Sequence, residues 1–196
     1  MIRVTRGLLM IMVGIGAASP VLCAAQPQTK SGAVFVMTNA ADKNQVLAFE
    51  RAANGTLTHA QTFDTEGRGS GGVNDPLESQ GSLTLSQDHS LLFAVNAGSG
   101  TVSIFRVHGA DLDNPDTVPS GGSQPVAVAE LGNLVFVLNS GGAGSVVGFQ
   151  LNPAGHLKQL ANSMAFLSAN ATGGASIAIS PDGKFVLVTE RLANNI

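Results

Sequence analysis

Short runs of apolar residues, separated by polar turns, recur along most of the chain. In residues 82–107, Leu83 and Leu85 alternate with polar neighbours before the continuous run Leu91–Val95. Alternation with a period of two, β-branched and aromatic residues, and boundaries of Gly, Ser, Asn and Asp are typical of strands, and these runs are too short for helices. The pattern therefore predicts antiparallel β-meanders.

The same meander occurs four times in a common register. Each unit has an apolar run that ends at a polar residue (Asn39, Asn96, Asn139 or Glu190), and these four markers are 57, 43 and 51 residues apart. In the last three units an alternating apolar pair precedes the marker by 13 and 11 residues: Leu83 and Leu85, Val126 and Val128, Ile177 and Ile179. Repeats of roughly 40–50 residues with several strands each are typical of propeller blades.

We therefore predict an all-β chain that forms a β-propeller of about three and a half blades, each a four-stranded antiparallel meander. The blade units are residues 32–67, 80–122, 123–170 and 174–196, the last one incomplete. A β-sandwich built from meanders is the alternative. The Gly-rich segment 65–79 is interpreted as a connection between blades, because a phosphate-binding loop requires a helix next and Pro76 and a strand follow instead.

Residues 1–25 have the order of a secretory signal peptide. Arg3 and Arg6 precede an apolar stretch of 12 residues, Gly7–Ala18, which is too short to span a bilayer, and small residues follow it. We expect cleavage after Ala24 or Ala25 and a periplasmic or secreted product, with lipid attachment at Cys23 as the alternative. Cys23 is the only cysteine, so the chain has no intrachain disulfide.

Composition narrows the classes of partner. The net charge of −3 and the 12% of charged residues give no electrostatic basis for binding nucleic acid or an anionic membrane. No segment predicts a membrane span. No group of Asp, Glu and His has metal-ligand spacing, so we expect no metal and no cofactor.

The open ring predicted here has a physical consequence. Propellers protect strand edges by closing the ring, and this chain ends where the third strand of the fourth blade is expected to begin. We therefore expect a truncated form or fragment of a longer propeller, or a chain that self-associates through the open blade face.

Three segments carry a family resemblance: GSLTLSQDHSLLFAVNAGSGTVSIFRV, PSGGSQPVAVAELGNLVFVLNSGGAGSVVGFQL and ASIAISPDGKFVLVTERLANNI. The chain resembles the N-terminal half of the seven-bladed propellers of the lactonase family, which includes 6-phosphogluconolactonase and 3-carboxymuconate cyclase. The resemblance implies a fragment of a seven-bladed ring and a site at the strand ends around the central channel. In the family, a histidine, an arginine and a glutamate are the proposed catalytic groups.

Residue by residue, the resemblance places the family's first histidine at Gln124 and its Arg-His pair at Ala175 and Ser176. The family's Asn-Glu-Leu motif aligns with Glu190-Arg191-Leu192, and a one-residue gap places the glutamate at Glu190. We therefore predict Glu190 and Arg191 as the catalytic candidates. The alternative for this pair is a self-neutralising surface ion pair.

Polar residues that recur at equivalent strand ends are the ligand-binding candidates: Gln80, Gln124, Asn96 and Asn139. Their alternative role is to cap strands and satisfy turn backbones. Two functions remain open. One is a hydrolase that opens a sugar or organic-acid lactone, with Glu190 as the base and Arg191 stabilising the oxyanion. The other is a non-catalytic propeller that binds a small carbohydrate-like ligand or a protein partner.

Overall fold

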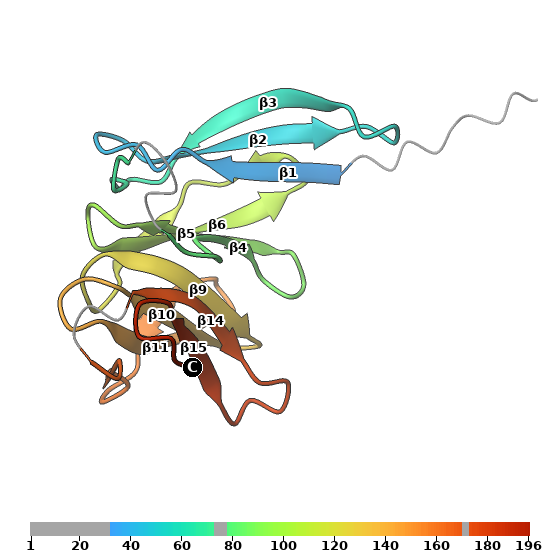
Figure 1. Cartoon of the computed structure of the whole chain (residues 1–196). Coiled ribbons are helices and arrows are strands. Elements are labelled where there is room, and N and C mark those ends of the chain that lie inside the picture. Colours follow the sequence, from blue (N-terminus) through green and yellow to red (C-terminus); the bar gives the residue numbers. More distant parts are fainter. Residues whose placement is uncertain (1–31, 73–77, 170–172) are drawn as a thin grey trace, which may run out of the picture.

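The described part of the chain consists of short strands arranged as four sheets that lie one beside the next (Figure 1). The structure is a computed structural model and describes residues 32–72, 78–169 and 173–196. These residues hold no helix, and therefore none that could cross a membrane. The predicted signal peptide lies outside them. The all-β prediction is confirmed.

The first sheet has three strands in the order β1-β2-β3. Their bounds are Gly32–Met37, Gln45–Arg51 and Leu57–Asp64, with Val34 opposite Phe49 in the first pairing. The turn between β2 and β3 uses Gly55 at a φ of 88°, a left-handed conformation that glycine adopts without a Cβ clash. By the common register β1 corresponds to the second strand of the later units, so within the described residues this sheet has no strand in the inner position.

The second sheet contains β4 (Leu83–Leu85), β5 (Leu91–Asn96), β6 (Thr101–His108), β7 (Asp111–Leu112) and β8 (Asp116–Pro119). Both β7 and β8 pair with β6. Residues 111–122 are mostly polar and carry two prolines, so the hydrophobic pattern gives little sign of β8. Among the described strands β8 pairs only with β6, and an edge strand tolerates a terminal proline such as Pro119 because the missing N–H is not needed there.

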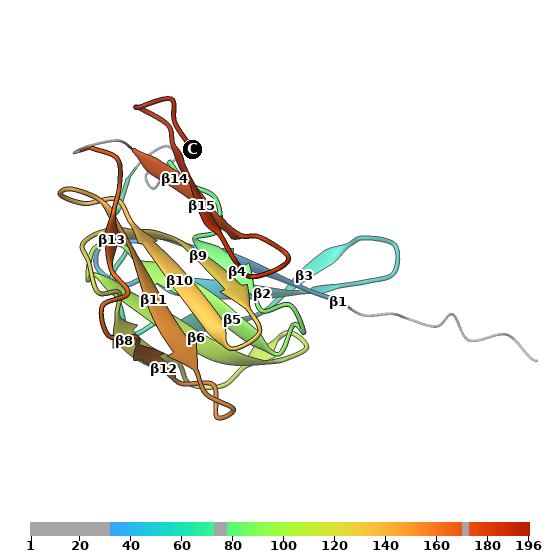
Figure 2. The same ribbon diagram turned by 90° about the horizontal axis from the view of Figure 1, so that it is seen from below.

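The third sheet repeats this plan with β9 (Pro125–Leu131), β10 (Leu134–Asn139), β11 (Ser145–Leu151), β12 (Leu157–Gln159) and β13 (Ala165–Phe166). The outer position beside β11 is shared by β12 and β13, as β7 and β8 share it beside β6. Figure 2 shows this sheet lying over the second, with the fourth beside it.

The fourth sheet is the hairpin of β14 (Gly174–Ile179) and β15 (Val186–Glu190). Its turn closes with a hydrogen bond of 2.8 Å from the Gly183 N–H to the Ser180 carbonyl, and Gly183 has a φ of 70°. The Ser180–Gly183 segment therefore forms a tight turn. Among the described strands, β15 pairs only with β14, so its other edge is open apart from the bridge between Glu190 and Asn195.

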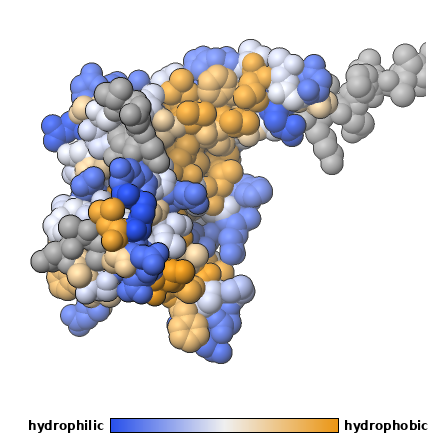
Figure 3. Space-filling view, in the orientation of Figure 1, coloured by the Kyte–Doolittle hydropathy of each residue, from blue (hydrophilic) through white to orange (hydrophobic). Residues whose placement is uncertain are grey.

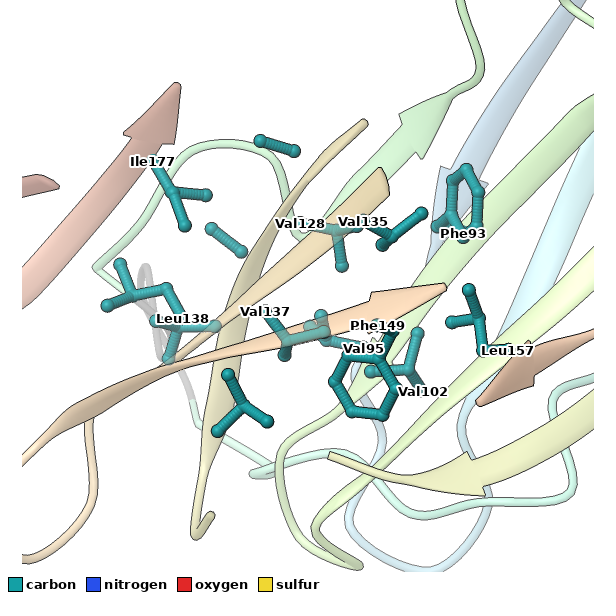
Figure 4. Packing of buried hydrophobic residues seen from close by; sticks show 14 of the residues in the cluster. Phe93, Val95, Val102, Val128, Val135, Val137, Leu138, Phe149, Leu157 and Ile177 are labelled. Atoms are coloured by element: carbon teal, nitrogen blue, oxygen red, sulfur yellow. The ribbon is translucent and has the colours of Figure 1, made fainter. Parts of the chain in front are cut away.

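The core lies between the sheets. One cluster joins Phe93 and Val95 of β5 to Val137 and Phe149 of the third sheet and to Ile177 of β14 (Figure 4). A second cluster joins Val46 of the first sheet to Phe105 of the second. Because apolar side chains of every sheet pack against the neighbouring sheet, the four units form one stack.

Apolar surface remains open at the two ends of this stack. Figure 3 shows it over the first sheet, where β1 lies in Figure 1, and again beside the β14–β15 hairpin. Phe185, Leu187 and Leu192 are 65%, 46% and 66% exposed, and Val36 of β1 is 49% exposed. These faces lack the cover that the second and third sheets give each other.

Candidate functional site

The residues predicted as a site lie at one end of the blades. Asn96, Asn139 and Glu190 end the second strand of their sheets. Asn139 lies opposite Pro125 at the start of β9, and Glu190 lies opposite Gly174 at the start of β14. The arrowhead of β1 in Figure 1 points to this end, which we call the strand-end face.

Asn96 is a buried link between the first and second sheets. Its Oδ1 accepts hydrogen bonds from Asn44 Nδ2 at 2.8 Å and from Thr65 Oγ1 at 2.7 Å. Its Nδ2 donates to Thr101 Oγ1 at 3.1 Å and to Ser103 Oγ at 2.8 Å. The side chain is fully buried, so its hydrogen-bonding groups are engaged within the protein.

Asn139 and Glu190 make the same kind of link one sheet further on. Asn139 Nδ2 donates to the Ser120 carbonyl at 3.4 Å, and Glu190 Oε1 accepts from the Ser168 N–H at 2.8 Å. Thr65, Ser120 and Ser168 each follow the last strand of the preceding sheet. The recurring strand-end residues therefore connect neighbouring sheets. This role resembles the alternative in which they cap strands and satisfy turn backbones.

Glu190 is held as a carboxylate. The Ser168 hydroxyl donates to Glu190 Oε2, and this bond, with that from the Ser168 N–H, holds the pKa of the Glu190 carboxyl below its usual value. The Glu190 N–H donates to the Asn195 carbonyl at 2.9 Å, so residues after β15 fold back beside it. A carboxylate with both oxygens engaged and a lowered pKa is a weak general base.

Arg191 forms an ion pair with Glu78, which lies before the second sheet. Two residues later the Gln80 N–H donates to the Ala175 carbonyl of β14 at 2.8 Å. Ser79 Oγ also donates to the Val126 carbonyl of β9 at 2.9 Å. The segment 78–80 therefore lies across the starts of β9 and β14, and brings Gln80 close to the predicted catalytic pair.

A cleft of about 690 Å³ opens beside the fourth sheet at this end. The residues that line it are Ala175, Thr189, Glu190, Arg191, Asn194, Asn195 and Ile196. A cleft of this size with a carboxylate, a guanidinium and two amides can hold a small polar molecule. Ala175, the position aligned with the family's arginine, therefore presents a methyl group to it.

Gln124 lies at the same end but does not line this cleft. Its side chain is exposed, and its φ of 53° lies in the left-handed region that non-glycine residues rarely adopt. The Ser140 N–H donates a hydrogen bond of 3.0 Å to the Gln124 carbonyl. Strained residues of this kind cluster at binding sites, so the ligand-binding hypothesis for Gln124 stays a prediction.

The sequence did not point to Ser168, Glu78 or Asn195. One signal could have found Ser168: it follows the last strand of its unit, as Thr65 and Ser120 do. Over residues 32–72, 78–169 and 173–196, no three His, Cys, Asp or Glu side chains come close enough to hold a metal ion.

Comparison with known proteins agrees with this architecture. The model of the family "Lactonase, 7-bladed beta-propeller" matches residues 28–166. The chain therefore belongs to the lactonase family of seven-bladed β-propellers. None of the curated proteins compared with the chain matches it.

Solved structures share the fold at low sequence identity. A protein from Lactobacillus plantarum is 17% identical with a TM-score of 0.62, and the match covers 83% of this chain and 46% of that one. A putative 6-phosphogluconolactonase from Bacteroides fragilis is 19% identical with a TM-score of 0.55, covering 85% and 52%. The periplasmic gluconolactonase PpgL of Pseudomonas aeruginosa is 21% identical with a TM-score of 0.50, covering 74% and 42%. The chain thus spans about half the length of these proteins.

Proposed function

We propose that this chain binds a lactone or a carbohydrate-like small molecule in the cleft beside Glu190 and Arg191. The observation that supports the proposal is the cleft itself, which is lined by both a carboxylate and a guanidinium at the strand-end face of a lactonase-family propeller. Hydroxyl and carbonyl groups need both an acceptor and a donor, and these two side chains supply them.

Binding is favoured over rapid hydrolysis by the chemistry of this pair. Lactone hydrolysis needs a base that takes a proton from water as its oxygen attacks the carbonyl carbon, after which the ring C–O bond breaks and the hydroxy acid leaves. The Ser168 contacts and the lowered pKa weaken Glu190 as that base. Arg191, the oxyanion partner, is already paired with Glu78.

Slow lactone hydrolysis is the second candidate function. Family membership and the names of two of the structural neighbours favour it. In this reaction Glu190 would act as the base and Arg191 would stabilise the oxyanion, while Gln80 and Gln124, which lie at the same end of the blades outside the cleft lining, are further candidates for contact with the sugar hydroxyls.

The test combines binding and turnover. Calorimetric titration with D-gluconate, the stable hydroxy acid, should give saturable heat that falls in Arg191→Gln. A pH-stat assay with D-glucono-δ-lactone should give little protein-dependent rate after subtraction of spontaneous hydrolysis. Saturable binding unaffected by Arg191→Gln, or no binding of either compound, would overturn the proposal. Turnover that Glu190→Gln abolishes would establish the second candidate instead.

We also propose that the protein is exported. The charged, apolar and small-residue order of residues 1–25 supports this, and so does the description of one structural neighbour as periplasmic. N-terminal sequencing of the natural product should begin near Ala25 or Gln26, and a product that keeps Met1 would contradict export.

A further inference from the structure

A second groove lies at the opposite end of the blades from Glu190 and Arg191. It has a volume of about 570 Å³ and lies between the second and third sheets. Its walls are the β4–β5 turn at residues 86–90, the β9–β10 turn at residues 132–133 and the β11–β12 turn at residues 152–155. Neither Glu190 nor Arg191 lines it, so this groove is separate from the cleft at the strand-end face.

Two contacts between the sheets fix the walls of this groove. Arg106 Nη2 of β6 donates to the Ala154 carbonyl in the third sheet. The Gln87 N–H in the β4–β5 turn donates to Glu130 Oε2 of β9 at 2.9 Å. Because both contacts involve backbone groups of a turn, the groove is formed before any ligand arrives, which lowers the entropy lost on binding.

Arg106 supplies a positive charge with spare hydrogen-bond donors. A guanidinium has five N–H donors, and the Ala154 carbonyl takes one of them. Within the part of the chain that the structure describes, Arg106 is in no ion pair. The side chain is exposed at the groove, and Gly155 lies against it: a Cβ built at Gly155 would be 3.3 Å from Arg106 Nη2.

Glu130 and Asp88 supply negative charge to the same groove. Asp88 Oδ1 accepts hydrogen bonds from the hydroxyls of Ser86 at 2.6 Å and Ser90 at 2.7 Å. These bonds, led by that from Ser86, lower the pKa of Asp88 to about 2, so the carboxylate is charged at neutral pH. Neither carboxylate forms an ion pair with Arg106, so positive and negative groups stand apart along the groove.

The remaining lining is mainly apolar or neutral. Leu91 is buried, Leu151 is half-buried, and Pro153 lies in the β11–β12 turn. The amides of Asn133 and Gln150 complete the lining, with Gln150 Nε2 donating to the Asn133 carbonyl at 3.0 Å. The groove therefore offers separated charges of opposite sign together with an apolar surface.

We infer that this groove binds a zwitterionic ligand with an apolar side chain, namely a free amino acid or short peptide. The ligand carboxylate pairs with Arg106, its ammonium group pairs with Glu130 and Asp88, and its side chain packs on Leu91, Leu151 and Pro153. A purely anionic or purely cationic ligand would satisfy one charge and leave the other facing a like charge. This inference does not rest on the proposed lactone-binding function.

The probe is the dipeptide Gly-Leu, titrated into the purified protein and followed by backbone and side-chain amide shifts in ¹⁵N NMR spectra. The shifts should cluster at residues 86–91, 130–133 and 150–155. N-acetyl-Gly-Leu and Gly-Leu-amide each lack one terminal charge and should bind three- to fivefold more weakly, since an exposed ion pair contributes up to about 1 kcal/mol.

Matched variants assign each charge. In Arg106→Gln, Gly-Leu and Gly-Leu-amide should bind with equal affinity, because the carboxylate has lost its partner. In Glu130→Gln, the difference in affinity between Gly-Leu and N-acetyl-Gly-Leu should become smaller. Arg51→Gln removes an exposed cation of the first sheet and should change nothing. Equal binding of all three peptides by the unaltered protein, shifts centred on Glu190 and Arg191, or no saturable shifts would overturn the inference. The peptide comparison needs no variant and so holds even if a variant fails to fold.

Discussion

Truncation of Asn96 to alanine should be one of the most damaging single polar changes in this fold. Asn96 makes four hydrogen bonds: those to Asn44 and Thr65 join the first and second sheets, and those to Thr101 and Ser103 lie within the second sheet. The change removes all four of these bonds at once. The expected result is a large loss in the free energy of unfolding.

The magnitude follows from the contacts. A buried hydrogen bond contributes about 1 kcal/mol net, so four bonds set an upper value near 4 kcal/mol. Asn44 still donates to the Val95 carbonyl, Thr65 to the Asn44 carbonyl and Ser103 to the Thr65 carbonyl after truncation. Since these partners are not left unsatisfied, we expect a loss of about 3 kcal/mol.

Asn139 provides a matched control. Asn139 is also fully buried at the equivalent strand end, but it makes one bond of 3.4 Å, and its Oδ1 has no partner among the described residues. Asn139→Ala should therefore cost no more than about 1 kcal/mol. Urea unfolding followed by far-UV circular dichroism suits a chain without Trp or Tyr. Losses that agree within about 0.5 kcal/mol for the two variants would refute the reasoning.

Three further predictions follow from the same structure. The pKa of the Glu190 carboxyl is lowered in the folded state, so this group stabilises the fold above the ordinary carboxyl pKa, and the stabilisation is lost as the pH falls through the lowered pKa. The urea midpoints of the protein and of Glu190→Gln should therefore differ at neutral pH and converge in acid. A difference that stays constant with pH would contradict this. His89 has a φ of 60°, and Gly183 has a φ of 70° at the equivalent position of its turn. In thermal melts His89→Gly should therefore be neutral or stabilising by about 0.5 kcal/mol, and Gly183→Ala should be destabilising by about 1 kcal/mol. Stability changes of the same sign for the two variants would contradict this. The exposed Phe185 and Leu187 should drive concentration-dependent self-association that light scattering detects. The double variant Phe185→Ser, Leu187→Ser should associate less. The same mass distribution for the variant and the unaltered protein would count against an open blade face.

The sequence predicts most of this fold because its strands are encoded by local periodicity. The runs ending at Asn96 and Asn139 are buried between neighbouring sheets, whereas those ending at Asn39 and Glu190 lie at the two ends of the stack and are partly exposed; the spacing of all four reflects one structural unit. The outer strands are less predictable. Residues 116–119 carry little apolar signal, and β8 is held by pairing with β6 rather than by burial of its own side chains.

The candidate site is less well encoded than the fold. Glu190 and Arg191 were found through a family alignment, while their partners Ser168 and Glu78 come from segments 22 and 113 residues away. No short-range pattern specifies such contacts, because they depend on how whole sheets stack. The lowered pKa of Glu190 and the pairing of Arg191 with Glu78 therefore required the three-dimensional structure.

The most direct test of the proposed function is to map where a sugar acid binds. Titration of the ¹⁵N-labelled protein with D-gluconate should shift the amides of Ala175, Thr189, Arg191 and Asn195, which line the cleft at the strand-end face. These shifts should saturate and should be weakened by Arg191→Gln but not by Arg106→Gln. Saturable shifts confined to the groove around Arg106, or no shifts up to high ligand concentration, would contradict the assignment of this cleft as the ligand site.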